Sequence, residues 1–467
     1  MQNYQLLING ELVTTSETLE VINPATGEAF ATCPKGNQEI LDQAIKAAQN
    51  AFPSWSQQPI EERQACLIKL GDALKENLES LAELLTKEQG KPLFESRGEI
   101  EGTIAHVYHN AKLQLPVEVI QDDNEALVEV HRTPLGVVAG ITPWNFPIMC
   151  SLCKLAPAVL AGNTFIWKPA STTPLTALAI GELCQAIFPA GVINILADSS
   201  GLGAKVTQHP DIVKVTFTGS TDTGRRVMQA SADTLKRVTL ELGGNDPAIV
   251  LSDANVSEIA PALYRAGFNN CGQTCVAMKR LYVHEDLYDA MCDEFAKLAK
   301  AAVVGNGLDP ETTMGPIQNA AQRDKVAEFL ESAKQTGNII AGGHLIDGPG
   351  FFMEPTVVRD VTDGDMLVDE EPFGPILPII KFSDTDDVIE RANRSPYGLG
   401  ASVWSSDIAK AKQVAARLQA GTKWVNHHGT TLPHIPFGGI KDSGIGVEYT
   451  EEGLLEFTNT EVINILK

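Results

Sequence analysis

The fold is decided by residues 136–170, GVVAGITPWNFPIMCSLCKLAPAVLAGNTFIWKPA. The segments GVVAGI and NTFIWK have the apolar, β-branched composition of buried strands. Between them, PIMCSLCKLAPAVLAG is typical of a helix that ends at Gly162. The stretch from Thr133 to Cys153 carries no charge over 21 positions, but its prolines would break a membrane-spanning helix. The sequence therefore predicts a strand, a loop, a buried helix and a second strand, as in a parallel sheet.

This alternation continues toward the C-terminus. The strand-like segments GVINILAD, VKVTFTGS and RVTLELGG are separated by helical segments, and a second alternation runs from about Asn245 to Asn426. An α/β fold is predicted, with two Rossmann-like doubly wound α/β domains and ligands at the carboxyl ends of the strands.

The remaining segments attach to these two domains. Residues 1–31 resemble short strands with turns, and residues 37–115 repeat apolar residues at helical spacing. Residues 117–132 and the C-terminal segment LLEFTNTEVINIL alternate like exposed strands, so they are expected to pair with another strand.

Composition excludes several classes of function. The formal net charge of −23 opposes binding to phosphate backbones, so no nucleic-acid partner is expected. Eight cysteines in 467 residues are too few for a disulfide scaffold and indicate reduced thiols. The segment MQNYQLLING shows no secretory signal pattern. A cytoplasmic protein with no membrane partner is expected.

Three side chains at predicted strand or helix ends have catalytic potential: Cys275 in FNNCGQTC, Glu241 in ELGGNDP and Asn145 in TPWNFP. A thiol can act as a nucleophile, a carboxylate as a general base, and an amide as an oxyanion donor. Each also has an ordinary alternative. A cysteine is usually a small buried hydrophobe, a glutamate at a strand end is usually solvated, and an asparagine between prolines usually forms a turn.

A nucleotide site is indicated more weakly by FTGSTDTG, residues 217–224. It follows a predicted strand and opens a predicted helix, where backbone N–H groups bind phosphate. Gly219 and Gly224 would allow close approach of the backbone, and Ser220 could bind phosphate. An ordinary strand-to-helix turn would look the same.

Seven motifs in one order remove this ambiguity: TPWNFP, WKPA, FTGS, ELGGNDP, FNNCGQTC, EEPFGP and PFGGIKDSG. From about Asn9 to Ile465 the chain resembles the aldehyde dehydrogenase superfamily, in particular its hydrolytic bacterial members. The resemblance implies a dinucleotide-binding domain (1–116 and 133–243), a catalytic domain (244–443) and oligomerisation strands (117–132 and 455–467). It also implies NAD or NADP as cofactor and a homodimer or homotetramer.

The resemblance assigns roles to the catalytic candidates. Cys275 matches the nucleophile that forms a thiohemiacetal and then a thioester. Asn145, with the backbone N–H of Cys275, matches the oxyanion site. Glu241 matches the base that activates water, and its presence argues against release of an acyl-CoA. Glu448 in GVE matches a second acid often assigned to proton relay.

Further residues match cofactor and substrate contacts. Lys168 matches the adenosine-ribose ligand, Ser220 the pyrophosphate contact, Glu371 and Phe373 the clamp on the nicotinamide ribose, and Trp144 lies beside the site. The expected substrate pocket consists of apolar or soft side chains: Phe146, Met149, Cys150, Cys153 and Phe437.

Two absences bear on the substrate. Family members that oxidise succinate semialdehyde bind its carboxylate through arginines, and here those positions are Cys153 and Asn269. A carboxylate without these partners would be poorly paired. A neutral aliphatic or aromatic aldehyde is therefore expected. A succinate-semialdehyde-type enzyme and a non-catalytic structural member of the family are the alternatives.

Cofactor choice is read from Ser171, three residues after Lys168. Members that prefer NAD usually have a glutamate there, which accepts hydrogen bonds from the ribose hydroxyls and repels a 2′-phosphate. Serine brings no charge, which would leave Lys168 to pair with added phosphate. NADP is therefore expected to be used, with NAD also accepted. The alternative is that Ser171 is simply the N-terminal cap of the helix that follows.

Other polar groups carry less. Cys150 and Cys153 form a CxxC pair that lacks the context of a redox or zinc site, and Cys271 could form a disulfide with Cys275 under oxidation. His427 and His428 resemble a metal pair only by adjacency, so no metal is expected.

Overall fold

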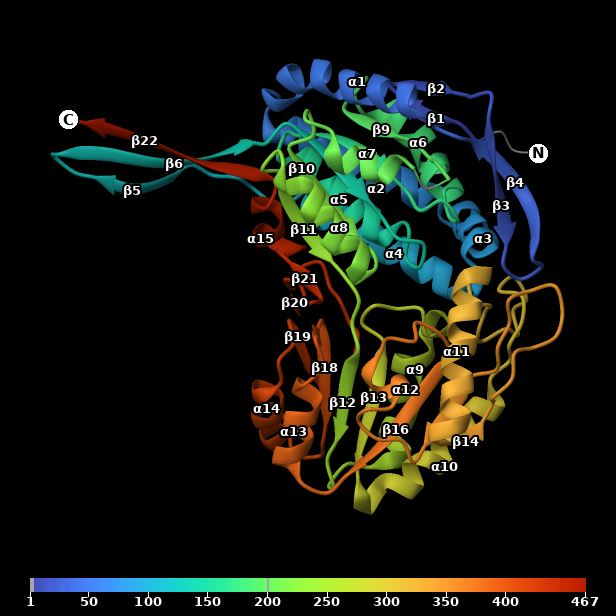
Figure 1. Cartoon of the computed structure of the whole chain (residues 1–467). Helices are drawn as coiled ribbons and strands as arrows, with labels where there is room; N and C mark the ends of the chain where they lie inside the picture. Colours follow the sequence, from blue (N-terminus) through green and yellow to red (C-terminus); the bar gives the residue numbers. More distant parts are fainter. Residues whose placement is uncertain (1–3, 200) are drawn as a thin grey trace.

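The computed structural model describes residues 4–199 and 201–467, which form two α/β units and a projecting three-stranded arm (Figure 1). The first unit is built on an eight-stranded sheet and the second on a seven-stranded sheet. Strand β11 lies in the first sheet and β12 in the second, so the predicted boundary at 243/244 falls between them. The predicted α/β class with two doubly wound sheets is confirmed.

The first sheet has the strand order β2-β1-β9-β8-β7-β10-β11-β21. From β9 to β11 all neighbours are parallel, so the chain order of these five strands is 3-2-1-4-5. The order reverses between β7 and β10, and this is where open α/β sheets bind ligands. The strands are β1 (Leu6–Ile8), β2 (Glu11–Val13), β7 (Val137–Ile141), β8 (Thr164–Lys168), β9 (Ile193–Ile195), β10 (Lys214–Thr218), β11 (Arg237–Glu241) and β21 (Gly444–Ile445).

Helices cover this sheet as the apolar periodicity predicted. In the decisive stretch, β7, α5 and β8 follow one another, and Gly162 adopts a φ of 98° after the helix. Such an angle favours glycine because it has no Cβ. The helices are α1 (Gln38–Ser56), α2 (Ile60–Glu76), α3 (Leu78–Gln89), α4 (Leu93–Asn110), α5 (Met149–Leu160), α6 (Leu175–Ile187), α7 (Leu202–Gln208) and α8 (Thr221–Ala232).

One alternative reading is wrong: Ser171 does not cap α6. The helix begins at Leu175 with Pro174 at the cap position, and Ser171 lies in the preceding turn. The buried carboxylate of Glu88 caps this helix instead, because its oxygens accept the N–H groups of Leu175 (2.7 Å) and Thr176 (2.9 Å).

The second sheet has the order β14-β15-β16-β13-β12-β18-β19, and all neighbours except β14 and β15 are parallel. Its strands are β12 (Asp246–Val250), β13 (Met278–His284), β14 (Asn338–Ala341), β15 (Thr356–Arg359), β16 (Ile376–Phe382), β18 (Gly400–Trp404) and β19 (Thr422–Val425). Its helices are α9 (Val256–Phe268), the 3-10 helix η1 (Asn269–Gly272), α10 (Glu285–Ala301), α11 (Ala320–Thr336), α12 (Met366–Asp369), α13 (Thr385–Asn393) and α14 (Ile408–Arg417).

The arm consists of β5 (Glu118–Asp122), β6 (Ala126–Pro134) and β22 (Thr458–Leu466), in the order β22-β6-β5. It extends away from the body of the molecule (Figure 1). The expected C-terminal strand thus pairs with β6 of its own chain. Its predicted start at 455 is wrong, because Leu455 still belongs to α15 (Thr450–Leu455). Two small two-stranded sheets, β3 (Thr18–Asn23) with β4 (Glu28–Pro34) and β17 (Tyr397–Gly398) with β20 (Ile440–Lys441), complete the fold.

None of the helices within 4–199 and 201–467 is long and apolar enough to cross a membrane.

Candidate active site

The candidate residues gather where the two units meet. Asn145 follows β7, Glu241 is the last residue of β11, and Cys275 lies in the loop between η1 and β13. Asn145 and Glu241 are 5% and 4% exposed, and Cys275 is half-buried. Asn145 and Glu241 lie at the carboxyl ends of parallel strands in the first sheet, whereas Cys275 precedes β13 of the second sheet. The hydrogen bond from Asn145 Nδ2 to the Gln273 carbonyl joins the two units here, so side chains 130 residues apart in sequence share one site.

The loop that carries Cys275 has an unusual backbone. Asn270, Cys271 and Gly272 adopt φ angles of 50°, 58° and 71°. A Cβ on Gly272 would lie 2.2 Å from the carbonyl oxygen of Gly374, so this position requires glycine. Residues other than glycine cost free energy in this left-handed conformation, and they adopt it where the surrounding contacts hold them there. Here they turn the chain sharply before Cys275.

Side chains hold the carbonyl groups of this loop. The Gln273 carbonyl accepts Asn145 Nδ2 (2.9 Å), and the Val276 carbonyl is bonded to His428 Nε2 (2.9 Å). Lys279 Nζ donates to the carbonyls of Thr274 (2.8 Å) and Cys275 (2.7 Å). The backbone around the thiol is thus fixed from several sides.

The Cys275 thiol lies among charged groups of both signs. Burial raises its pKa to about 12. The Lys279 ammonium lowers this pKa, whereas the carboxylates of Glu241, Glu371 and Asp246 raise it. A thiolate is the reactive form of a cysteine, so Lys279 favours the nucleophile and the acids oppose it.

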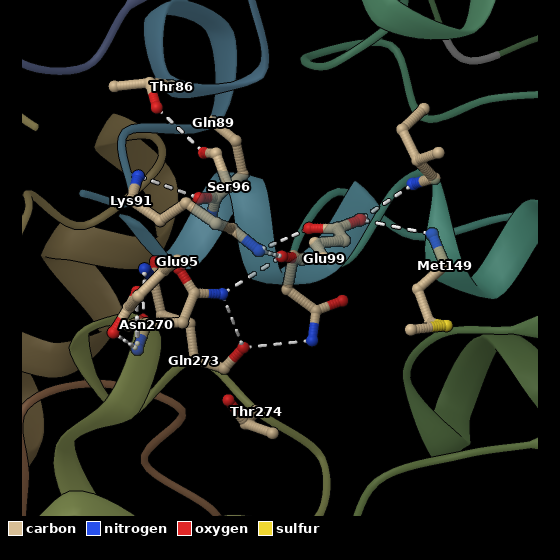
Figure 2. Close-up of polar contacts among 12 residues, drawn as sticks. Thr86, Gln89, Lys91, Glu95, Ser96, Glu99, Met149, Asn270, Gln273 and Thr274 are labelled. Atoms are coloured by element: carbon tan, nitrogen blue, oxygen red, sulfur yellow. Dashed lines mark hydrogen bonds and ion pairs between the residues drawn. The ribbon is translucent and has the colours of Figure 1, made fainter. Parts of the chain in front are cut away.

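A buried network holds the backbone of Asn145. Figure 2 shows its members Lys91, Glu99, Met149 and Asn270. Its carbonyl oxygen accepts Lys91 Nζ (2.8 Å) and Asn270 Nδ2 (3.0 Å). Lys91 is also paired with Glu99 (2.6 Å), and both side chains are fully buried. The other Glu99 oxygen accepts the N–H groups of Ile148 (2.9 Å) and Met149 (3.2 Å) at the start of α5. The amide of Asn145 is therefore positioned from its backbone as well as its side chain.

Glu241 has a different environment. Neither of its carboxylate oxygens has a partner with hydrogen-bond geometry among residues 4–199 and 201–467, although the backbone N–H of Gly439 is close enough to lower its pKa. Burial and then the nearby Glu448 raise its pKa well above that of an ordinary carboxyl group. Lys154 forms a buried ion pair with Glu448. Burial disfavours the Lys154 charge, yet Glu448 raises the net pKa of this lysine.

The predicted cofactor residues lie around the same edge. Trp144 and Phe373 make an edge-to-face contact with centroids 5.4 Å apart. Glu371 Oε1 contacts Lys279 (3.0 Å) and accepts the N–H of Gly244 (3.2 Å). A Cβ on Gly243 would lie 2.5 Å from Glu371 Oε2, so the double glycine leaves room for that carboxylate.

The turn at β10 fits a phosphate group. Ser220 is the N-terminal cap of α8, and its hydroxyl accepts the N–H of Thr223 (3.4 Å). The Thr218 hydroxyl, at the end of β10, is buried and has no partner in the described part of the chain. Gly219 and Gly224 pack against the side chains of Phe217 and Leu242, so their small size serves local packing. Together with the switch point between β7 and β10, this arrangement fits a dinucleotide.

The expectation that Lys168 lacks an acidic partner is wrong. Its Nζ atom lies 2.6 Å from Asp198 Oδ1, and both side chains are buried. Asp198 follows β9 and also accepts the N–H of Leu202 (2.6 Å) at the start of α7. Lys168 therefore has a negatively charged neighbour, Asp198, although Ser171 is uncharged.

The expected pocket residues are only partly brought together. Phe437 packs with Cys275 and stacks on Tyr449 with centroids 5.6 Å apart, while Cys153 contacts Met149 (Sγ–Sδ 3.7 Å). The Phe146 ring instead covers the Lys91 ammonium at 3.7 Å.

Sequence reasoning missed two residues, Tyr449 and Lys279. Burial, and then Cys153 and Glu448, raise the pKa of the Tyr449 hydroxyl far above its usual range, which places it near the site. Both residues lie close to recognised motifs, Tyr449 directly after GVE and Lys279 four residues after Cys275. That proximity was the available signal.

The remaining polar groups have structural environments. All eight cysteines are free, including Cys150 and Cys271. His428 is buried between Ser402 Oγ (2.9 Å) and the Val276 carbonyl, and burial lowers its pKa to about 3.

Comparison with known proteins agrees with this geometry. The model of the aldehyde dehydrogenase family matches residues 12–463. The chain is 37% identical to an aldehyde dehydrogenase of a Fusarium species, over 99% of this chain and 98% of that protein. It is 38% identical to the phenylacetaldehyde dehydrogenase of Pseudomonas fluorescens, over 99% of this chain and 96% of that protein.

A solved structure is equally similar. The NAD+ complex of an aldehyde dehydrogenase from Bacillus cereus superposes with a TM-score of 0.97 at 37% identity, covering 100% of this chain and 97% of that chain. The chain therefore belongs to the aldehyde dehydrogenase family and is an oxidoreductase that oxidises aldehydes with NAD(P).

Proposed function

We propose that the chain converts a neutral aldehyde to its carboxylic acid through a thioester on Cys275. The thiolate of Cys275 attacks the carbonyl carbon, and the oxygen gains negative charge. Asn145 Nδ2 and the Cys275 N–H stabilise this charge. Glu371 and Phe373 would hold the nicotinamide ribose, and the cofactor bound there would supply the hydride acceptor. Glu241 then takes a proton from the water that attacks the thioester, which releases the acid and regenerates the thiol.

The observation that carries this proposal is the state of Glu241. A base for a mobile water must be free to accept a proton, and both oxygens of this buried carboxylate lack protein hydrogen bonds in the described chain. Its raised pKa brings it toward the range in which a carboxylate is an effective base. Glu448, paired with Lys154, is proposed to accept the proton in turn.

A single-turnover experiment with Glu241→Gln tests the mechanism. The variant is expected to release about one reduced nicotinamide per site and then to lose steady-state turnover by roughly 10²- to 10⁴-fold, as for loss of a general base. Mass spectrometry should find the acyl group on the peptide that contains Cys275. Full steady-state turnover by this variant, or an unmodified Cys275, would contradict the mechanism.

The substrate is proposed to be an aliphatic or aromatic aldehyde without a carboxylate. Phe437 and Tyr449 share a hydrophobic cluster with Cys275 and supply apolar surface there, and Met149 and Cys153 form a second, soft contact. One relative acts on phenylacetaldehyde by its name. A panel of aldehydes with matched length should give higher kcat/KM for neutral members than for succinate semialdehyde.

Both nucleotides are proposed to bind, with NAD binding more tightly than the sequence alone indicated. The Asp198 carboxylate lies against Lys168, so a 2′-phosphate at this lysine would meet a negative charge. Ribose hydroxyls, in contrast, can donate to a carboxylate.

Domain roles and assembly are also proposals. We assign dinucleotide binding to the first unit and the nucleophile to the second. The arm exposes Val119, Ile120, Val462 and Ile463, and strands β5 and β22 leave free edges. Exposed apolar strands favour pairing with another subunit. Light scattering at micromolar concentration should show a dimer or tetramer, and a 50.2 kDa monomer would contradict this. The eight free thiols support a cytoplasmic location.

A further inference from the structure

Lys279 binds the loop that carries Cys275 (residues 273–277, the nucleophile loop), although no motif assigned this lysine a role. It is the second residue of β13 and is 3% exposed. Its ammonium group contacts three oxygens: the carbonyls of Thr274 (2.8 Å) and Cys275 (2.7 Å), and Glu371 Oε1 (3.0 Å). An ammonium group has three donors, so all of its hydrogen-bonding capacity is used.

The contact with Thr274 fixes the direction of the next amide. In a trans peptide the carbonyl of one residue and the N–H of the next point in opposite directions. Because Lys279 holds the Thr274 carbonyl on its own side, the Cys275 N–H points away from the lysine. That N–H donates no backbone hydrogen bond within residues 4–199 and 201–467, so it remains available to an aldehyde oxygen.

A purely structural role does not require a charge at this place. Burying an ammonium group costs several kcal/mol unless partners compensate, and a methionine of similar volume would avoid the cost. The lysine directs its three donors to the backbone carbonyls of Thr274 and Cys275 and to the carboxylate of Glu371. Glu371 in turn accepts the Gly244 N–H, and the Phe373 ring lies 5.7 Å from the ammonium group.

We infer that Lys279 is a positioning residue for the nucleophile: it orients the Thr274–Cys275 peptide toward the aldehyde oxygen and links this loop to Glu371. The inference rests on the proposed role of Cys275. The same ammonium group favours the thiolate of Cys275. The charged or titratable groups that face this thiol are Lys279 from β13, Glu241 from β11, Asp246 from β12, Glu371 from the loop before β16, and Cys150 from α5. Lys279 is the cation among them.

Alkylation of the enzyme without nucleotide separates this role from turnover. Iodoacetamide would be added to the wild type and to Lys279→Met across a range of pH, and the adduct on Cys275 quantified by mass spectrometry. We expect the pH profile of the variant to shift to higher pH and its rate at neutral pH to fall about tenfold, as for one unit in a thiol pKa. Its kcat should fall by roughly 10- to 100-fold, since an oxyanion donor is misaligned. Lys279→Arg, which keeps the charge, should recover part of the alkylation rate.

Lys441→Met is the matched control. Lys441 also donates to two backbone carbonyls, those of Asn393 (2.8 Å) and Ser395 (3.1 Å), but it makes no contact with the nucleophile loop in the described chain. Its alkylation profile should equal that of the wild type. If Lys279→Met does not fold, Lys279→Gln replaces it with the same readouts.

The inference is overturned if a folded Lys279 variant without the charge alkylates at the wild-type rate and keeps the wild-type kcat. This outcome is distinguishable from failure of the proposed function. Turnover by Cys275→Ala would refute the proposed function, whereas an inactive Cys275→Ala together with wild-type alkylation and kcat of Lys279→Met would refute only the role of Lys279.

Discussion

Two buried glutamates of the first unit, Glu99 and Glu241, have opposite environments. The side chain of Glu99 is fully buried, and both of its carboxylate oxygens have partners. One oxygen pairs with Lys91 at 2.6 Å, and the other accepts two N–H groups at the start of α5. Glu241 is 4% exposed, has no hydrogen-bonding partner for either oxygen in the described chain, and lies near a second acid, Glu448.

This difference distinguishes a structural carboxylate from one suited to chemistry. A buried polar group that is fully satisfied rigidifies its surroundings, while an unsatisfied one costs free energy. Glu99 pairs with Lys91 (Figure 2), and Lys91 in turn holds the backbone carbonyl of Asn145. Glu241 retains a destabilising environment, which fits its proposed role as the base for water. The proposed catalytic role thus belongs to Glu241, the carboxylate whose oxygens lack hydrogen-bond partners in the described chain.

The largest expected effect tests whether Glu241 has an acyl group to act upon. Cys275→Ala should lower acid formation by about four orders of magnitude or more, because no thioester can form. Cys271→Ala is the matched control, since that thiol is buried four residues earlier. The measurement is reduced nicotinamide per enzyme at saturating aldehyde. Equal losses in both variants would show that the loop, and not the thiol, was disturbed.

The next effect concerns the satisfied glutamate. Glu99→Gln removes the charge that balances Lys91 and should lower the free energy of unfolding by about 3–5 kcal/mol, as when one partner of a buried ion pair is lost. Urea denaturation measures this change. As a control, Glu79→Gln breaks the exposed pair of Glu79 and Arg97 and should cost less than about 1 kcal/mol. If the two variants are equally stable, the Lys91–Glu99 pair does not have the structural importance assigned to it.

Glu241→Gln is expected to raise the free energy of unfolding at neutral pH, in contrast to Glu99→Gln. The folded protein raises the pKa of Glu241, so the native state holds this proton at pH values where the unfolded chain has lost it. The contribution of this group to stability therefore falls as pH rises above its unfolded pKa. Relative to wild type, Glu241→Gln should gain stability on going from acid to neutral pH. Thermal unfolding at several pH values measures the trend; a variant that loses stability as pH rises would refute the unsatisfied state of Glu241.

The smallest effect involves a third buried carboxylate, Asp198, which is paired with Lys168 as Glu99 is paired with Lys91. Asp198→Asn should weaken NAD binding and strengthen NADP binding, with a change in their ratio of about tenfold, or about 1.4 kcal/mol. Titration of each nucleotide by intrinsic fluorescence measures the ratio without turnover. Ser171→Glu should move the ratio toward NAD. An unchanged ratio in both variants would mean that another residue reads the 2′ position.

Local sequence determined much of this protein. The apolar runs of residues 136–170 are enough to predict β7, α5 and β8, because strand and helix periodicities differ and Gly162 marks the helix end. The motifs around Asn145, Glu241 and Cys275 identified the candidate chemistry, since each pairs a reactive side chain with a turn at a predicted strand or helix end. The resemblance they carried was confirmed by the family match.

Tertiary structure alone decided the partners of these residues. Asp198 lies 30 residues from Lys168, and Glu99 lies 46 residues from Asn145. The local sequence pattern of these segments does not predict the Lys168–Asp198 pair or the link from Glu99 through Lys91 to Asn145. The same holds for Glu88, which caps α6 in place of the nearby Ser171. A side chain's reactivity depends on which charges and N–H groups reach it, and distant segments supply these only after the chain has packed. The sequence therefore names the reactive groups, and the fold decides which of them are satisfied and which remain free to react.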